Sequence, residues 1–182
     1  MGMEGVKSIA QALKVQGSAR TLILDDNWSL DRVAGGDAWM GVLIEALLMN
    51  TTLKSLSLRK NALTLSSAIA LAIVLPRLSL DTLNLGTNHI GDSRTPRRDA
   101  DLVEGFEALA HALQDNANTI TCLDLSSNHM GPKGVAAIAT KMRNVSVMTA
   151  LDLSGEPRTS TVKREWEIAD LVVIRNAYNK AN

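Results

Sequence analysis

The chain has 182 residues, and its 19 lysines and arginines balance 19 aspartates and glutamates, so its formal net charge is zero. This balance excludes binding to nucleic acid or to anionic membranes through a general positive field. Its one cysteine, Cys122, excludes an internal disulfide and the multi-cysteine zinc frameworks. Since no apolar run approaches the roughly 20 residues that cross a bilayer, we expect a soluble protein of the cytoplasm or another reducing intracellular compartment.

A helix is the first element that the sequence predicts, over residues 4–16. Similar amphipathic stretches precede each later strand, with apolar residues four apart on one helical face. In chain order these stretches are IAQAL (9–13), LIEAL (43–47), LAIVL (71–75), LAHAL (109–113) and IATKM (138–142). The first helix has no strand before it. Either this helix alone caps the amino-terminal end, or the chain is a fragment of a longer repeat array.

Five short segments align without gaps and predict five β-strands. Each has leucine at its second and fourth positions, and in chain order they are TLILDDN from Thr21, SLSLRKN from Ser55, TLNLGTN from Thr82, CLDLSSN from Cys122 and ALDLSGE from Ala150. The first leucines of successive segments lie 34, 27, 40 and 28 residues apart. The two shorter spacings indicate one repeat unit, and the two longer ones indicate the same unit with insertions.

An asparagine closes each of the first four segments, as Asn27, Asn61, Asn88 and Asn128. Each lies where a strand ends and the backbone turns inward, which leaves buried amide and carbonyl groups in need of partners. A carboxamide offers two donors and one acceptor. We therefore expect the asparagines to form a structural ladder along the repeats.

The pattern L-x-x-L-x-L-x-x-N, with a full helix between strands, resembles the ribonuclease-inhibitor-like subfamily of leucine-rich repeat proteins. The phrase LIEALLMNTTLKSLSLRKN, over residues 43–61, is similar to a typical member almost throughout. The resemblance implies an α/β fold, a right-handed leucine-rich-repeat solenoid forming a horseshoe segment, with parallel strands on the concave face and helices on the convex face. It implies almost nothing about activity, because this scaffold serves many binding roles.

The repeat pattern changes after the fifth segment. Glu156 replaces the closing asparagine, and Pro157 then interrupts the chain. Residues 162–180 place Trp166 and later apolar residues at helical spacing, which predicts a terminal helix that caps the last core layer. We expect a single domain over residues 1–182, with about five repeats across residues 4–156.

Side chains between the strand leucines point outward from the sheet and form rows across it. They are small and mostly polar, and Arg59 and Asp124 are the best candidates for contacting a partner because charged anchors of this kind occur at interfaces. The candidate partner-binding residues on the strands are Ile23, Asp25, Ser57, Arg59, Asn84, Asp124 and Asp152.

Two insertions add further candidates. Residues 28–36 put Trp28 in a glycine-ended loop, where the ring either binds a partner or folds back on the core. Residues 91–101 are a solvated loop, a contact for an acidic partner, or a site where phosphorylation of Ser93 or Thr95 would offset the arginines. This second insertion contains three arginines, Arg94, Arg97 and Arg98.

The sequence contains no recognisable catalytic motif. His89 and His129 each follow an asparagine, so stacked repeats could bring the two rings together, but no third metal ligand is evident. Cys122 has no histidine in register to generate a thiolate. We therefore expect no enzyme activity, no cofactor and no metal.

The sequence thus predicts a non-catalytic protein–protein interaction module, a scaffold or a subunit of a larger assembly, with a protein partner and no nucleic-acid or membrane partner. The strand face and the insertions would carry recognition. One alternative is a GTPase regulator, because a GTPase-activating protein of the nuclear-transport system shares this repeat type, although none of its functional residues is matched here. Another is the sensor part of a larger immune-type receptor.

Overall fold

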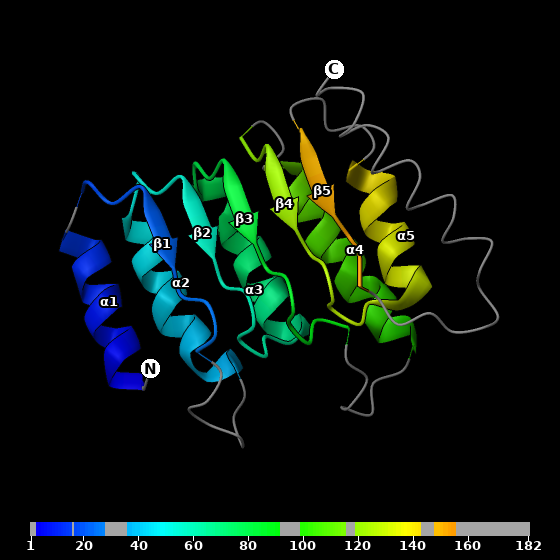
Figure 1. The fold of residues 1–182 in the computed structure, drawn as a ribbon, viewed down its shortest axis with the longest axis horizontal. Helices are drawn as coiled ribbons and strands as arrows, with labels where there is room; N and C mark the ends of the chain where they lie inside the picture. The colour runs from blue at the N-terminus through cyan, green and yellow to red at the C-terminus, as the bar shows by residue number, and fades with distance from the viewer. Residues whose placement is uncertain are drawn as a thin grey trace.

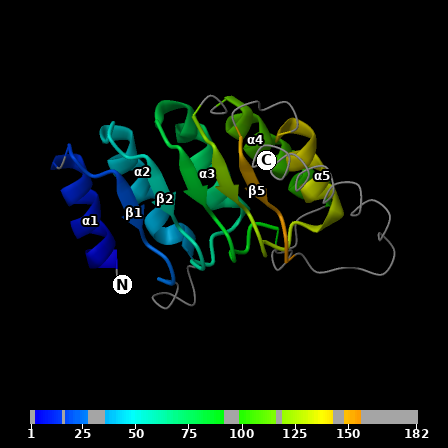
Figure 2. The same ribbon diagram turned by 45° about the horizontal axis from the view of Figure 1, so that its top comes forward.

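The protein folds into two layers, a parallel sheet on one face and a row of helices on the other (Figures 1 and 2). A computed structural model describes residues 3–15, 17–27, 36–91, 99–115, 119–142 and 148–155. Strand and helix alternate along the chain, and each helix returns the chain so that the next strand lies parallel to the last. The expected leucine-rich-repeat solenoid is confirmed.

The sheet consists of five three-residue strands in chain order, all parallel. The strands are β1 (Thr21–Ile23), β2 (Ser55–Ser57), β3 (Thr82–Asn84), β4 (Cys122–Asp124) and β5 (Ala150–Asp152). Their pairing register aligns Leu22 with Leu56, then with the equivalent leucines of β3, β4 and β5. The residues that align in the five sequence segments are therefore the residues that pair in the sheet.

The helices lie where their apolar stretches predict them. They are α1 (Met3–Val15), α2 (Met40–Met49), α3 (Leu65–Val74), α4 (Asp99–Asp115) and α5 (Gly131–Met142), with the short 3₁₀ helices η2 (Gly36–Trp39) and η3 (Leu75–Arg77). The expected loop over residues 91–101 is partly wrong, because α4 already begins at Asp99.

The strand leucines form the centre of the core. The first leucines of β2, β3 and β4 are each no more than 1% exposed, whereas Leu22 and Leu151 in the two outer strands are half-buried. Each inner leucine packs against a repeat on both sides, while each outer one has a neighbouring described strand on one side. Stability in such a solenoid comes from stacking of adjacent repeats.

Small residues let adjacent helices approach closely. A Cβ atom on Gly105 in α4 would lie 2.4 Å from Leu65 Cδ2 in α3, and one on Gly134 in α5 would lie 2.8 Å from Phe106 Cε2 in α4. Both glycines occupy the same position relative to the apolar stretch of their helices. The α3–α4 and α4–α5 contacts therefore each have a glycine at the same repeat position.

The asparagine ladder is present as expected. The Asn61 side-chain amide donates to the carbonyl oxygen of Leu24 in the preceding repeat at 2.8 Å. The Asn61 backbone N–H donates to Asn88 Oδ1 at 2.8 Å, and the Asn27 backbone N–H donates to Asn61 Oδ1 at 3.1 Å. Asn61, Asn88 and Asn128 are each at most 1% exposed. Each asparagine therefore closes its own turn and ties it to the neighbouring repeat.

Several sequence predictions lie outside the described residues. These are Trp28, the three arginines Arg94, Arg97 and Arg98, the position of Glu156 and the terminal helix over residues 162–180. Among the described helices, none combines the length and the apolar character needed to span a membrane.

Candidate functional site

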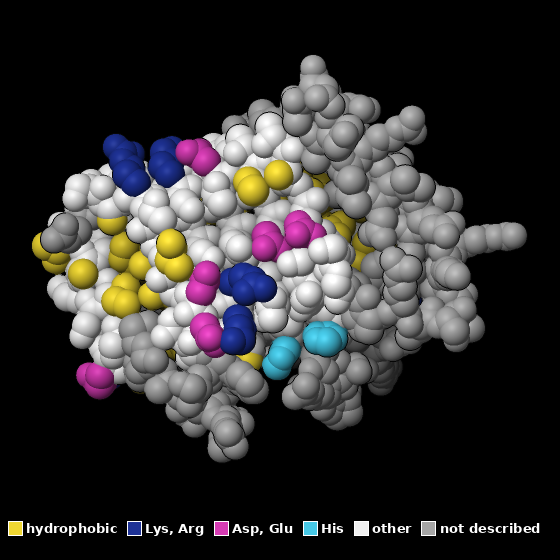
Figure 3. All heavy atoms as spheres, viewed as in Figure 1, with side chains coloured by type: hydrophobic (Ala, Val, Ile, Leu, Met, Phe, Trp, Pro, Cys, Tyr) yellow, Lys and Arg dark blue, Asp and Glu magenta, His cyan; other side chains and the backbone are white. Residues whose placement is uncertain are grey.

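The outward side chains of the strands and of the turns after them form three rows, which we call the sheet face (Figure 3). Strand pairing fixes the first two rows, and the residues two positions further on make the third. From β1 to β5 the rows are Thr21, Ser55, Thr82, Cys122 and Ala150; then Ile23, Ser57, Asn84, Asp124 and Asp152; then Asp25, Arg59, Gly86, Ser126 and Ser154. Figure 3 shows acidic and basic side chains gathered over the middle of this face.

Side chains of the second row accept hydrogen bonds from the backbone of the turns that follow the strands. Asn84 Oδ1 accepts the backbone N–H of Gly86 at 2.9 Å, and Asp124 Oδ1 accepts that of Ser126 at 2.9 Å. Asp152 Oδ1 accepts the backbone N–H of Ser154 at 2.9 Å. A side-chain oxygen that bonds the backbone two residues on is an Asx turn. Asn84, Asp124 and Asp152 therefore stabilise turns on the same face that would bind a partner.

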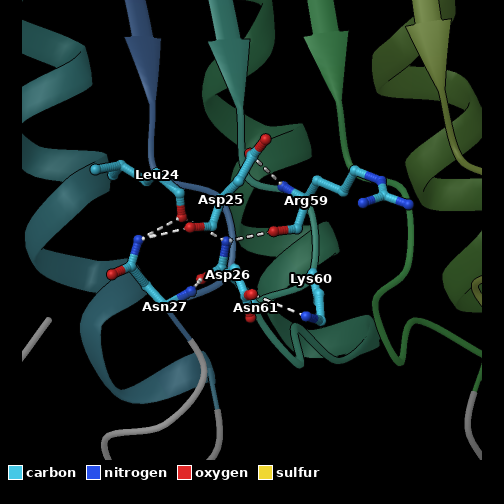
Figure 4. A network of polar contacts seen from close by, with 7 residues as sticks. All are labelled: Leu24, Asp25, Asp26, Asn27, Arg59, Lys60 and Asn61. Carbon is cyan, nitrogen blue, oxygen red and sulfur yellow. Dashed lines mark hydrogen bonds and ion pairs between the residues drawn. The ribbon is translucent and has the colours of Figure 1, made fainter.

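The second repeat achieves the same turn with a residue of its neighbour. Ser57 occupies the second row there, and the backbone N–H of Arg59 donates to Asp25 Oδ1 from the first repeat at 3.0 Å (Figure 4). The Ser57 hydroxyl donates to the same oxygen at 2.5 Å. Asp25 thus replaces the missing local acceptor, and it fixes β1 against β2 where the strands end.

Arg59 is the basic candidate among the described strand residues, and it is exposed, as are the acidic candidates Asp25 and Asp152. Figure 4 shows its side chain extending away from Asp25, toward the β3 side of the sheet. No ion pair within 4.0 Å joins it to an acidic side chain in the described part of the chain. Next to it in the row is Gly86, which has no side chain to cover the guanidinium. The group is therefore available to an acidic partner.

Asp124 lies on the other side of Gly86. A Cβ atom on Gly86 would lie 2.9 Å from both carboxylate oxygens of Asp124, so the carboxylate leans over the glycine. Asp124 also stands directly opposite Asp152 in the β4–β5 pairing. Like charges opposite each other destabilise a sheet. A positive group on a partner would relieve that repulsion.

The sheet face is thus different at its two ends. Ile23 on β1 is 65% exposed, an unusual position for a large aliphatic side chain. Arg59 follows on β2, and the two aspartates lie on β4 and β5. From β1 to β5 the face therefore presents the apolar Ile23 with the acidic Asp25, then the basic Arg59, and then the acidic Asp124 and Asp152.

Cys122 in the first row is not an activated nucleophile. Burial raises the pKa of its thiol above the usual value of 9.0, and the Asp124 carboxylate raises it further. A thiol with a raised pKa is mostly protonated at neutral pH, and the thiolate is the reactive form. Among the described residues, no group of three or more His, Cys, Asp or Glu side chains could hold a metal.

Two polar clusters of the described structure were not recognised in the sequence. The Asp37 carboxylate in η2 accepts the Thr64 backbone N–H at 3.2 Å and the Thr64 hydroxyl at 2.6 Å, and it also accepts the Ser67 hydroxyl. The buried Asn50 donates to Leu13 O at 3.1 Å and accepts the Leu53 backbone N–H at 2.9 Å. Thr64 immediately before an apolar run was the available signal for the first cluster.

A model of the leucine-rich repeat matches residues 50–72 and 116–139. These segments contain β2 with most of α3, and β4 with most of α5. These two segments match the leucine-rich repeat in sequence. No curated protein matches the sequence.

Solved structures share the whole arrangement of the repeats. The tropomodulin C-terminal domain of Caenorhabditis elegans matches with a TM-score of 0.66 and 14% identity, over 97% of this chain and 95% of that one. Leiomodin-1 actin-binding site 2 matches with a TM-score of 0.64 and 20% identity, over 96% and 90% of the two chains. Identities this low establish a common fold.

Proposed function

We propose that this leucine-rich repeat chain is a non-catalytic interaction module that binds a protein partner through its sheet face. The single observation that carries the proposal is the exposed Arg59, which forms no ion pair among the described residues, on a regular five-stranded face. Rows of outward side chains on a rigid sheet suit recognition, because the scaffold holds them in place without reorganisation. The module acts as a scaffold or as a subunit of a larger assembly in a reducing intracellular compartment.

The polarity of the face defines the chemistry of the partner. The partner places an apolar side chain on Ile23, an acidic side chain on Arg59 and a basic side chain between Asp124 and Asp152. Adjacent strands lie about 4.8 Å apart, so the acidic and basic groups of the partner are separated by about 10–15 Å. Opposed charges at this spacing also exclude partners of the reverse polarity.

Actin is the first partner to test, because leiomodin-1 actin-binding site 2 shares the fold. The measurement is co-sedimentation of the chain with filamentous actin, together with pull-down of monomeric actin. Saturable binding to either form supports actin as the partner. If the chain remains in the supernatant and is not pulled down with monomer, actin is excluded, and a two-hybrid screen is then needed to supply the partner.

The position of the interface is tested by Arg59→Glu, with Lys133→Glu on the exposed surface of α5 as the matched control. We expect Arg59→Glu to weaken partner binding by about 2 kcal/mol or more, because charge reversal leaves two acidic groups facing each other. Lys133→Glu makes the same charge change away from the sheet face and leaves affinity unchanged. Equal losses in the two variants would rule out the sheet face as the interface.

The finer sequence predictions belong to the same proposal. The insertions that carry Trp28 and the three arginines Arg94, Arg97 and Arg98 would extend the contact beyond the sheet face. Strand-to-strand spacings of 27 and 28 residues with full helices support the ribonuclease-inhibitor-like type of repeat. A GTP-hydrolysis assay with a panel of small GTPases tests the GTPase-regulator alternative, and the length of the native gene product tests the receptor alternative.

A further inference from the structure

The edge of β1 that faces away from β2 is an open edge of the sheet. Arg20 O accepts a backbone N–H of β2 at 3.0 Å, and the Leu24 backbone N–H donates to Ser57 O at 2.9 Å. Because alternate residues of a strand direct their backbone groups to opposite edges, Thr21 and Ile23 direct theirs away from β2. Within the described residues, no hydrogen bond engages these backbone groups. An edge of this kind is a template for pairing with another chain.

The core is incompletely covered at the same edge. Leu22 is half-buried, whereas the aligned Leu56 in β2 is 0% exposed, and Ile23 is 65% exposed. Figures 1 and 2 both show α1 beyond β1 at this end, so the helix layer extends further than the strand layer. A strand added beside β1 would therefore cover Leu22 and bury apolar surface, which stabilises association.

The asparagine ladder has an unused acceptor at this edge. Asn61 Oδ1 accepts the Asn27 backbone N–H at 3.1 Å, and Asn88 Oδ1 accepts that of Asn61 at 2.8 Å. The Asn27 side-chain amide bonds its own turn, donating to Leu24 O at 2.8 Å and to Asp25 O at 3.0 Å. In the part of the chain that the structure describes, no N–H donates to Asn27 Oδ1. That oxygen is therefore placed to accept a backbone N–H from a segment that runs parallel to β1, as the later asparagines accept one from the repeat before them.

Charged side chains stand at both ends of the edge. Arg20 precedes β1 and Asp25 follows it, and both are exposed. Asp25 accepts the Ser57 hydroxyl and the Arg59 backbone N–H through Oδ1, which leaves Oδ2 without a partner among the described residues. A parallel segment with an acidic side chain at its amino end and a basic side chain at its carboxyl end is therefore complementary in charge.

We propose that the β1 edge binds an extended segment of a protein partner as an additional parallel strand. The segment is about eight residues long, enough to reach from the start of β1 to Asn27. Its backbone pairs with Thr21 and Ile23, and one of its apolar side chains covers Leu22. In strand addition, main-chain bonds give affinity and alternate side chains give specificity. The edge is separate from Arg59, whose side chain extends toward β3 (Figure 4), so the inference does not depend on binding through the sheet face.

The test is an NMR titration of the ¹⁵N-labelled full chain with the peptide acetyl-ETVILKGN-amide, up to millimolar concentration. We expect saturable shifts of the Thr21 and Ile23 backbone amides and of the Asn27 side-chain amide, with slower hydrogen exchange at the two backbone amides. The peptide acetyl-KTVILEGN-amide exchanges the two charges and should bind at least about threefold more weakly, because exposed ion pairs contribute modestly. Absence of the expected shifts, or equal affinity for the two peptides, would overturn the proposal.

Two variants at one position separate the backbone from the side chain. Ile23→Pro removes an edge N–H and keeps the β1–β2 bonds, since proline is tolerated on an edge strand. It should lower the affinity for the first peptide at least about fivefold, because one hydrogen bond is lost and the peptide carbonyl is left unpaired. Ile23→Thr keeps the N–H and should show a smaller loss. Equal affinities of the two variants, both folded by their urea midpoints, would overturn the pairing.

A charge reversal tests the same edge without touching the strand backbone. Arg20→Glu should weaken binding of the first peptide about threefold. Arg77→Glu makes the same change on the exposed surface of η3 and should leave the affinity unchanged. Equal losses in the two variants would overturn the proposal. So would self-association of the free chain that Ile23→Pro abolishes, because it would assign the edge to a second copy.

Discussion

The residue before each closing position of the repeat adopts a left-handed backbone conformation. Asp26, Lys60, Thr87 and Ser127 have φ between 54° and 58°, and Gly155 at the same position of the fifth repeat has φ of 74°. For a residue other than glycine this conformation costs about 1–2 kcal/mol. The turn thus contains a small strain in each of the first four repeats, which the asparagine ladder and the stacked leucines offset.

Thr87 is the most unfavourable of these residues, because a β-branched side chain rarely adopts positive φ. We expect Thr87→Gly to raise the free energy of unfolding by about 0.5–1 kcal/mol, after the larger chain entropy of glycine in the unfolded state is subtracted. Urea denaturation followed by circular dichroism measures the change. Thr82→Gly, in the extended strand β3, is the control and should lower stability. A lower stability of Thr87→Gly would show that the turn is not strained.

The thiol of Cys122 reports on the electrostatics of the sheet face. Burial and then the Asp124 carboxylate raise its pKa, so the thiolate is scarce at pH 8. Asp124→Asn removes the negative charge but keeps the oxygen that accepts the Ser126 backbone N–H. We therefore expect a lower pKa for Cys122 and faster alkylation by iodoacetamide at pH 8, with a smaller change for Asp152→Asn. Identical rates in Asp124→Asn and the parent chain would contradict this electrostatic assignment.

Elements of adjacent repeats are joined by polar clusters as well as by apolar packing. Asp37 in η2 receives hydrogen bonds from both the backbone and the hydroxyl of Thr64, the residue that caps α3. Asn50, at the end of α2, bonds the last turn of α1 through Leu13 O. A helix end buried without a partner is costly. These two side chains therefore satisfy the helix ends where one repeat meets another.

Removal of the Asp37 carboxylate tests this coupling between elements. We expect Asp37→Ala to lower the free energy of unfolding by about 1–3 kcal/mol, because it leaves Thr64 and Ser67 donors without their acceptor. Hydrogen exchange at the Ser66 and Ser67 amides should accelerate as the first turn of α3 loosens. Asp37→Asn keeps a carbonyl oxygen in place and should show a smaller loss. Parent-like stability and exchange in Asp37→Ala would show that η2 is not coupled to α3.

Sequence periodicity predicted the elements well wherever the repeat imposes it. The strands, their register and the apolar face of each helix follow from positions that every repeat must fill, so five aligned copies reinforce one another. The start of α4 at Asp99 was missed because it lies in an insertion, where no other repeat provides a template. The acidic residues that favour helix initiation there were read as part of a loop.

At the scale of the whole molecule, the sequence predicted which side chains lie on the sheet face but not what those side chains contact. Outward positions on the strands were identified correctly, because alternation along a strand decides which side chains leave the core. The contacts of those side chains were not predicted. The hydrogen bonds between Asp25 and the second repeat, and the approach of Asp124 to Gly86, depend on residues of neighbouring repeats. Only the structure distinguishes Arg59 from Asp25, Asp124 and Asp152, whose carboxylates accept hydrogen bonds from the backbone of the turns.

Large exposed apolar side chains also have an uneven distribution over the described molecule. Most lie in the first two helices and β1, as Met3, Val15, Ile23, Leu48 and Met49, with Ile73 on α3. The later described repeats present smaller or polar groups on their surfaces. On the sheet face, Ile23 on β1 is the exposed aliphatic candidate, and the charged candidates lie beside it and further along, as Asp25, Arg59, Asp124 and Asp152.

The most direct test of binding through the sheet face is an NMR titration of the isotope-labelled chain with its partner. We predict that the largest chemical-shift changes fall on the outward positions Ile23, Arg59 and Asp124, while the exposed α5 residue Lys133 stays unchanged. Localised changes of this kind would establish the sheet face as the interface. Changes concentrated on the helices, with Arg59 and its row unaffected, would contradict it and move the interface to the opposite layer.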